Sequence, residues 1–306
     1  MSGRNVAASV AARLLNRSKE TGDDYQTLLT SFALERFLYR LGVSDLRDRF
    51  VLKGAMLLRL WSDQPYRATR DLDLLRQGSG TLETTAEEIQ IVAGLQVPPD
   101  GISFDADRVT VEVIRATEDF NGARATLAAR CGNARLTAQI DVGLGDAVWP
   151  APERCVYPSL LDLPAPTVLV YPREAVVAEK LEAIVVLGDR NSRIKDFFDL
   201  HYLASRFGFD RETLTETIRR TFARRRTPFP GETPLGLTSA YWENPSRPAQ
   251  VRAFLRRAGL QGPEEPGEGV TTVIGPFLAP ILDDLREGRA KAGHWPPGGP
   301  WTAPRS

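Results

Sequence analysis

The sequence has few of the residues that carry the commonest metal and nucleophile chemistries. Its 306 residues include two cysteines and two histidines. Two cysteines cannot build a disulfide framework, and two histidines exclude both Cys/His zinc sites and an HExxH protease. A Ser-His-Asp triad would depend on His201, and the sequence has no GxSxG nucleophile elbow. Any chemistry is therefore expected to use carboxylates, lysine and arginine.

Long apolar runs and an excess of one charge are also missing. No run of about 18 apolar residues occurs, so we expect no membrane span. Arg13 and Arg17 interrupt the apolar stretch near the N-terminus, which does not fit a signal peptide. The 39 basic and 39 acidic residues cancel, which argues against a protein coated in basic residues but allows a local basic face. The sequence therefore predicts a cytoplasmic protein.

The hydrophobic pattern changes twice along the chain and predicts an α+β fold. Residues 1–60 have helical spacing, including an apolar stripe over 25–41. Residues 70–160 alternate as strands do, and 173–288 return to helical spacing. We expect a mixed sheet followed by a helical C-terminal half.

Proline and glycine mark the expected domain boundaries. A proline-rich connector covers residues 150–172. We expect a core domain with N-terminal helices at 1–165 and a helical domain that completes the cleft at 166–290. The segment 291–306 is rich in proline and glycine, so its composition predicts a disordered tail.

Two aspartates stand two residues apart in a predicted strand. Asp71 and Asp73 should therefore leave the same face, and Mg²⁺ is the hard cation that suits such a pair. Asp141 lies on the polar face of another predicted strand and is the candidate third carboxylate. The ordinary alternative is that the D-x-D pair is solvated surface, because such a string is common by chance.

A possible phosphate-binding turn precedes the aspartate pair. Lys53, Gly54 and Ala55 lie where a short predicted strand meets a predicted helix, and glycine lets a backbone approach a phosphate closely. Arg67 and Thr69 fall in the segment that leads into Asp71. A turn, a helix and a strand bearing D-x-D form a coherent unit for binding a polyphosphate.

Three sequence motifs span residues 50 to about 203: FVLKGAMLLRLWSDQPYRATRDLDLL, the strand IDVGLGD, and AEKLEAIVVLGDRNSRIKDFFDLHYL. Together they resemble the AbiEii/AbiGii (MenT-like) nucleotidyltransferase toxin family, of the DNA polymerase β-like superfamily. The resemblance implies a polymerase β-like nucleotidyltransferase core with a mixed sheet. It also implies NTP as substrate and two Mg²⁺ ions.

The resemblance assigns roles to the matching residues. Asp71, Asp73 and Asp141 would hold the metal ions, Lys180 would contact the nucleotide phosphates, and Asp196 would orient Lys180. The full set implied at the catalytic or nucleotide site is Lys53, Gly54, Ala55, Arg67, Thr69, Asp71, Asp73, Asp141, Lys180, Arg193, Lys195 and Asp196. One departure is that Gly54-Ala55-Met56 replaces the family's usual Gly-Gly-Thr or Gly-Ser, so a hydroxyl is missing at the turn.

The lysine and aspartates of the second half also admit a structural interpretation. Lys180 could pair with Glu179 or Glu182 on its own helix. Asp196 and Asp199 could form an intrahelical ion-pair network with Arg193, and we expect Asp199 to be structural. Only five of the 39 basic residues are lysines, and three of those five fall within the motifs. Lysine and arginine are not interchangeable at a phosphate, which favours the functional interpretation.

Two clusters of arginines are relevant to which molecule accepts the nucleotide. Seven arginines fall within residues 206–226, and a second cluster contains Arg252, Arg256 and Arg257. Such clusters can bind an RNA backbone, or they can be solvated helix ends. By resemblance we expect transfer of NMP to RNA, first to the tRNA 3′ end, blocking translation, with a cognate antitoxin as partner. The alternatives are transfer to a small molecule or a protein, and a non-catalytic nucleotide-binding interaction module.

Overall fold

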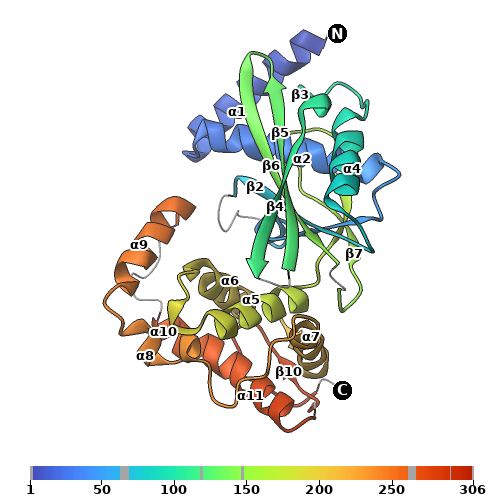
Figure 1. The fold of residues 1–306 in the computed structure, drawn as a ribbon. Coiled ribbons are helices and arrows are strands. Elements are labelled where there is room, and N and C mark those ends of the chain that lie inside the picture. The colour runs from blue at the N-terminus through green and yellow to red at the C-terminus, as the bar shows by residue number, and fades with distance from the viewer. Residues whose placement is uncertain are drawn as a thin grey trace. The chain divides into compact units, whose positions relative to one another are not determined.

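The chain divides into two compact units, and Figure 1 shows the elements of each (Figure 1). The first unit comprises Met1–Ala147 and Pro152–Tyr171, and the second comprises Val148–Ala151 and Pro172–Ser306. The computed structural model describes residues 3–62, 69–117, 120–145, 148–260, 267–289 and 291–304.

The first unit is built on an eight-stranded mixed sheet. Seven strands follow the order β3-β5-β6-β2-β1-β8-β7, and β4 pairs with β5 beside that path. The strands are β1 (Phe50–Lys53), β2 (Asp71–Arg76), β3 (Ile102–Phe104), β4 (Thr110–Thr117), β5 (Phe120–Cys131), β6 (Ala134–Leu144), β7 (Glu153–Val156) and β8 (Thr167–Val170). The helices are α1 (Gly3–Thr21), α2 (Tyr25–Val43), α3 (Met56–Leu60), α4 (Leu82–Gly94) and the 3₁₀ turn η1 (Ala106–Arg108).

The centre of the sheet combines parallel and antiparallel pairs. Strand β2 runs parallel to β6 and antiparallel to β1, while β6 is antiparallel to β5. Strand β1 is also parallel to β8. This mixed sheet, followed by a helical second half, confirms the predicted α+β class.

One face of the sheet is apolar and covered by helices. Ala129 of β5 and Leu136 of β6 pack in a buried cluster with Leu14 of α1 and Leu29 and Phe32 of α2. Residues alternate between the two faces of a strand, so the polar residues of β2 and β6 lie on the opposite face. The burial pattern therefore fixes which side of the sheet carries the aspartates.

A buried ion-pair network anchors the end of β2 to α4. Glu88 of α4 pairs with Arg76, with 2.7 Å between Oε2 and Nε, and with Arg49, with 2.7 Å between Oε1 and Nη1. The Glu88 and Arg76 side chains are 8% and 4% exposed. Burial alone would raise the pKa of Glu88, but hydrogen bonds from Arg76 and Arg49 hold it below the ordinary value of 4.5.

Glu88→Gln is expected to lower the free energy of unfolding by about 3–5 kcal/mol, because it leaves the buried Arg76 guanidinium without a carboxylate. The folded-state pKa of Glu88 is depressed, so its contribution is present above pH 4.5 and is lost as the pH falls through the folded value. The difference between wild type and variant should therefore shrink in acid. Urea unfolding at pH 7 and below pH 4 measures both effects.

The neighbouring Glu87 provides the control for that measurement. Its side chain is exposed on the same helix, so Glu87→Gln should change the free energy of unfolding by about 0.5 kcal/mol or less. Equal losses in the two variants would contradict the role given to the Glu88 network.

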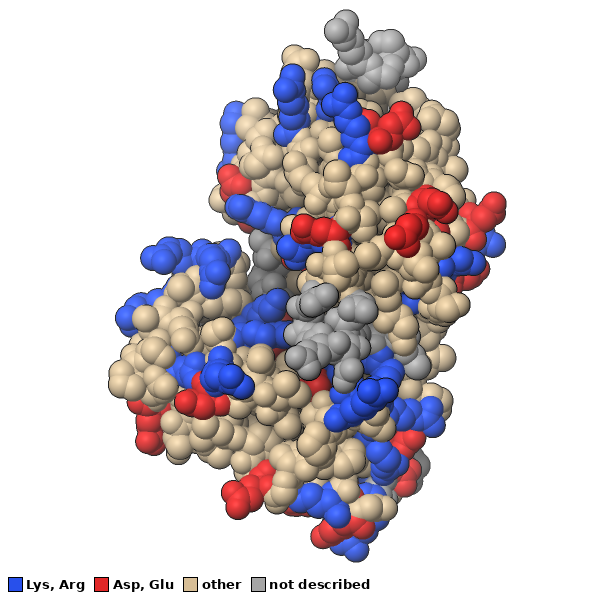
Figure 2. Space-filling view, in the orientation of Figure 1, with Lys and Arg blue, Asp and Glu red and all other residues tan. Residues whose placement is uncertain are grey.

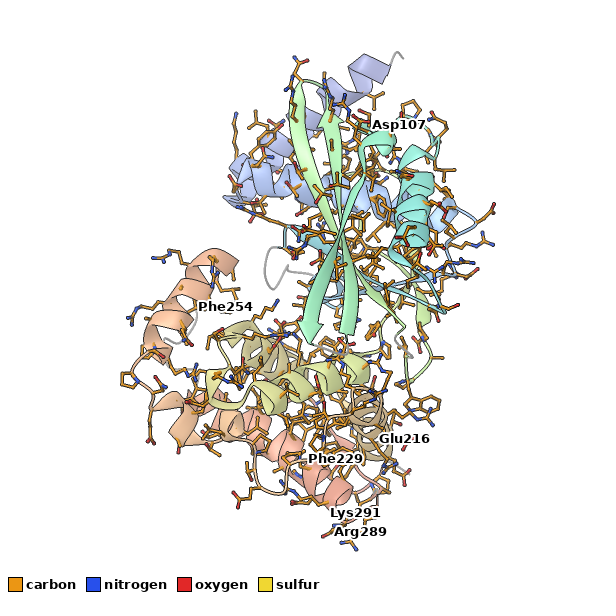
Figure 3. The ribbon with its side chains drawn as sticks, in the orientation of Figure 1. Asp107, Glu216, Phe229, Phe254, Arg289 and Lys291 are labelled. Atoms are coloured by element: carbon orange, nitrogen blue, oxygen red, sulfur yellow. The ribbon has the colours of Figure 1, made fainter. Side chains whose placement is uncertain are left out.

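The second unit is a helical bundle with short added strands. Helix α5 packs against α6 and α7, α7 packs against α11, and α9 packs against α6. Phe254 of α9, labelled in Figure 3, packs at a tilt against Phe198 of α6, with ring centroids 4.9 Å apart and ring planes 44° apart. The elements are α5 (Arg173–Leu187), η2 (Gly188–Arg190), α6 (Ile194–Arg206), β9 (Phe209–Asp210), α7 (Arg211–Arg224), η3 (Leu235–Leu237), α8 (Ser239–Trp242), α9 (Arg247–Ala258), α10 (Gly267–Gly269), the π-helical turn η4 (Val270–Ile274), α11 (Gly275–Arg286) and β10 (His294–Trp295).

Residues 291–304 pack onto this bundle. Strand β10 pairs with β9, and Trp295 is buried and donates its indole N–H to the carbonyl of Ala204. Trp301 stacks on Phe277, with ring centroids 5.8 Å apart. The disordered tail predicted from proline and glycine content does not describe this segment, because two tryptophans supply the apolar contacts that such a composition usually lacks.

Within the described ranges, every helix is too short or too polar to cross a membrane.

Candidate active site

The strand register brings the three candidate carboxylates to one face of the first unit. Asp73 of β2 is the direct partner of Asp141 on the parallel strand β6. Neighbouring strands lie about 4.8 Å apart, so these two residues are adjacent across the sheet. Asp71 lies two residues before Asp73 on the same face, about 6.6 Å along the strand. All three are half-buried.

Neighbouring side chains donate hydrogen bonds to Asp71 and Asp141. The Thr69 hydroxyl donates to Asp71, with 2.6 Å between Oγ1 and Oδ1. Arg124 of β5 binds Asp141 through two bonds, Nε to Oδ1 and Nη2 to Oδ2, each 2.8 Å long. Thr69, which the resemblance placed at the nucleotide, therefore contacts a candidate metal ligand here. Arg67 lies outside the described residues.

The turn after β1 lies directly beside Asp73. Lys53 is the register partner of Asp73, and Gly54 follows it with a φ of +72°, a left-handed conformation that favours glycine. A Cβ built at Gly54 would overlap the Asp73 carboxylate and lie 2.7 Å from its Cβ. The Asp73 carboxylate can therefore occupy this position only because Gly54 has no side chain.

The departure from the family pattern after Gly54 has a packing explanation. Ala55 and Met56 are both buried, and Met56 begins α3, a helix of five residues. These positions belong to the core of the first unit. The Lys53 ammonium lies 5.0 Å from the centroid of the Tyr171 ring.

The chemistry of the donors is that preferred by a hard divalent cation such as Mg²⁺, since all three side chains are carboxylates on one half-buried face. Among the residues that the structure describes, no group of three or more carboxylate, histidine or cysteine side chains is close enough to hold one ion. The Asp141 carboxylate is instead bound to Arg124.

A second charged cluster lies in the second unit, between α5 and α6. The Lys180 ammonium lies 3.1 Å from Oδ1 of Asp196 and 2.7 Å from Oδ2 of Asp199. Both aspartate side chains are buried, and Arg193 pairs with Asp196 at 2.7 Å. Lys195 is exposed. The structure therefore brings together the predicted pair Lys180 and Asp196, and it adds Asp199, which we had expected to be structural.

Several arginines of the 206–226 cluster have structural partners. Arg225 pairs with Glu179 and Glu182, the two residues considered as partners for Lys180. Burial lowers the pKa of Arg224 to about 10, and the neighbouring charge of Arg225 adds to this effect. Arg211 also pairs with Asp284, and Arg219 and Arg220 pair with Glu216. In the second cluster, Arg252, Arg256 and Arg257 are all exposed on α9.

Sequence reasoning missed Arg124, and a signal for it was present. Residues 124–131 lie within the range 70–160 predicted to form strands, and they alternate polar and apolar residues as the strand bearing Asp141 does. Hairpin pairing of the two strands would have placed Arg124 on the polar face, but the register that sets it opposite Asp141 depends on the turn between them.

Carboxylates from neighbouring strands on one face are the kind of side chain that metal-dependent phosphoryl and nucleotidyl transfer uses. The comparison with protein families makes the class specific. Residues 36–272 match the model of the family described as nucleotidyl transferase AbiEii toxin, type IV toxin–antitoxin system. The chain belongs to this AbiEii family and is a nucleotidyltransferase.

Two solved structures are similar to the chain. The crystal structure of JHP933 from Helicobacter pylori is 16% identical, with a TM-score of 0.47, covering 87% of this chain and 95% of that one. A presumed nucleotidyltransferase from Helicobacter pylori is 15% identical, with a TM-score of 0.45, covering 87% of this chain and 99% of that one. No curated protein matches the sequence.

Proposed function

We propose that the chain transfers NMP from an NTP to the 3′ end of an RNA acceptor, with tRNA as the first candidate, and so blocks translation. The single observation that carries the proposal is the register of the central strands, which sets Asp73 beside Asp141 with Asp71 on the same face. The family's toxin–antitoxin description implies an antitoxin partner that restrains this activity.

The proposed reaction exchanges a phosphoanhydride bond of the NTP for a phosphodiester bond to the acceptor. The acceptor hydroxyl oxygen bonds to the α-phosphorus, the bond from that phosphorus to the bridging oxygen breaks, and pyrophosphate leaves with the electron pair. The hydroxyl proton passes to solvent or to a carboxylate of this face. Asp71, Asp73 and Asp141 would hold Mg²⁺, which when bound supplies positive charge to the attacking and leaving oxygens.

The remaining residues would position the substrate. Thr69 restrains Asp71, and Gly54 leaves the Asp73 carboxylate its space. Lys180, restrained by two buried aspartates, would contact the nucleotide phosphates, as the family resemblance implies. A lysine restrained in this way loses little rotamer freedom when it binds a phosphate.

RNA is favoured as the acceptor by exposed basic side chains in the second unit. Arg252, Arg256 and Arg257 lie on the exposed side of α9, and Figure 2 shows basic side chains gathered over this helix (Figure 2). Contacts between arginines and phosphates position a polynucleotide without reading its sequence. A small-molecule acceptor would gain nothing from such a surface.

The test offers each NTP, labelled at the α-phosphate, to total RNA, to purified protein and to a small-metabolite extract in the presence of Mg²⁺. Wild type should label RNA of tRNA size, and a 3′ exonuclease should release the label. Asp141→Asn and Lys180→Ala should not label it. Label found only on protein or on small molecules would overturn the RNA assignment, and no label from any NTP would overturn the transfer itself.

A further inference from the structure

Arg124 is hydrogen-bonded to Asp141, one of the candidate metal ligands. It lies opposite Asp141 in the antiparallel pair of β5 and β6, and both carboxylate oxygens accept from its guanidinium. Paired N–H···O bonds between an arginine and a carboxylate are among the stronger ion pairs in proteins. The side chains are 34% and 18% exposed, so solvent screens the pair only in part.

The strand pairings place this arginine in a row of charged residues that runs across the sheet. Lys53 is opposite Asp73, Asp73 is beside Asp141, Asp141 is opposite Arg124, and Arg124 is opposite Glu112. Register partners share a face, so five neighbouring strands contribute one charge each to the same side of the sheet. The hydrogen bonds with Asp141 raise the pKa of the Arg124 guanidinium, and the charges of Glu112 and Asp71 add to the shift.

We propose that Arg124 is the resident counter-ion of Asp141 and competes with the divalent cation for that carboxylate. The inference rests on the proposed role of Asp71, Asp73 and Asp141 as cation ligands. A cation that binds Asp141 must displace the guanidinium or share the carboxylate with it. Either arrangement brings two positive charges close together, and Arg124 therefore weakens cation binding in the absence of nucleotide.

The direction of the effect separates this role from a structural one. If Arg124 only oriented Asp141, its removal would misplace a ligand and weaken cation binding. If Arg124 competes, its removal strengthens binding. Two unit charges about 4 Å apart in water repel by ~1 kcal/mol, and a divalent cation is repelled by at least this much, which corresponds to a change of about fivefold or more in a dissociation constant.

The experiment measures Mn²⁺ binding to the full chain without nucleotide, from the electron paramagnetic resonance signal of free Mn²⁺. Arg124→Gln keeps a polar side chain and removes the charge, and its Mn²⁺ dissociation constant should fall about fivefold or more. Arg124→Lys keeps the charge and should stay near wild type. The matched control is Arg130→Gln, an exposed arginine on the same strand and face, which removes the same net charge and should have no effect.

An unchanged or raised dissociation constant in Arg124→Gln would overturn the proposal, as would a wild type and variant that both fail to bind Mn²⁺. Thermal unfolding of each variant checks that the fold is intact. This result is independent of the transfer assay. If the Mn²⁺ dissociation constant of Arg124→Gln fell fivefold but no labelled product formed, the competition between Arg124 and the cation would stand and the proposed nucleotidyl transfer would be rejected. If labelled product formed but the Mn²⁺ dissociation constant of Arg124→Gln did not fall, the proposed transfer would stand and the competition would be rejected.

Discussion

Asp73→Asn is expected to reduce nucleotidyl transfer by about a thousandfold or more while leaving the free energy of unfolding within about 1 kcal/mol of wild type. The reason is the position of Asp73 at the centre of the carboxylate face, with Asp141 beside it and Asp71 on its own strand. Loss of one charged cation ligand removes several kcal/mol of transition-state stabilisation, and about 1.4 kcal/mol corresponds to a tenfold change in rate. Initial rates with α-labelled NTP measure the loss.

The control for that substitution is Asp107→Asn. Asp107 is an exposed aspartate of η1 in the same unit, and Figure 3 labels it (Figure 3). The substitution makes the same chemical change and should leave the rate within about twofold of wild type, because surface substitutions rarely cost more than 0.5 kcal/mol. Equal rates for Asp73→Asn and Asp107→Asn would contradict a catalytic role for the face that carries Asp73.

Gly54→Ala is expected to reduce transfer about a hundredfold, because its Cβ would overlap the Asp73 carboxylate and force it to move. Misplacement of a catalytic group by about 1 Å costs roughly this factor. The substitution should also cost about 1–2 kcal/mol of stability, since Gly54 has a φ of +72° and alanine disfavours that conformation. Rates and urea unfolding curves measure the two effects separately.

Gly78→Ala is the control that separates the effect of the steric overlap at Gly54 from the effect of backbone strain. Gly78 has a φ of +78°, and a Cβ built there meets no atom within 4 Å. Gly78→Ala should therefore cost the same stability but keep the wild-type rate. If both alanine variants lost the same activity, strain alone would explain the loss, and the contact between Gly54 and Asp73 would carry no functional weight.

Periodic patterns predicted most of the fold well. The apolar stripe over 25–41 lies within α2, and the helical spacing predicted to begin at residue 173 begins there with α5. The strands bearing Asp71, Asp73 and Asp141 were found because each alternates polar and apolar residues with one face buried. Such patterns are local, and one sequence is enough to read them.

Other elements escaped because their signals are short or mixed. Helix α4 begins with a capping box formed by Thr81 and Thr84, which is a sequence signal for the start of a helix. The first half of the helix is polar, however, and obscures the apolar stripe that contains Ile89 and Val92. Strands β7 and β8 have four residues each and lie within the proline-rich connector. Neither length nor composition distinguishes such strands from a loop.

The candidate site was predictable by residue type but not by pairing. The spacing of Asp71 and Asp73 fixes their common face, and that holds for any strand. Their neighbour across the sheet depends on long-range register, so the pairing of Asp141 with Arg124 could not be read from the sequence. The same holds for Lys180, whose contact with Asp199 depends on how α5 and α6 pack.

The position of a bound cation tests the account most directly. Crystals grown with Mn²⁺ and a non-hydrolysable NTP would locate the ion by its anomalous scattering, because Mn²⁺ accepts the same oxygen ligands as Mg²⁺. We expect a peak within about 2.0–2.6 Å of carboxylate oxygens of Asp71 and Asp73, on the face that also carries Asp141. A nucleotide bound with its metal elsewhere on the chain, and no peak at these aspartates, would contradict the central claim.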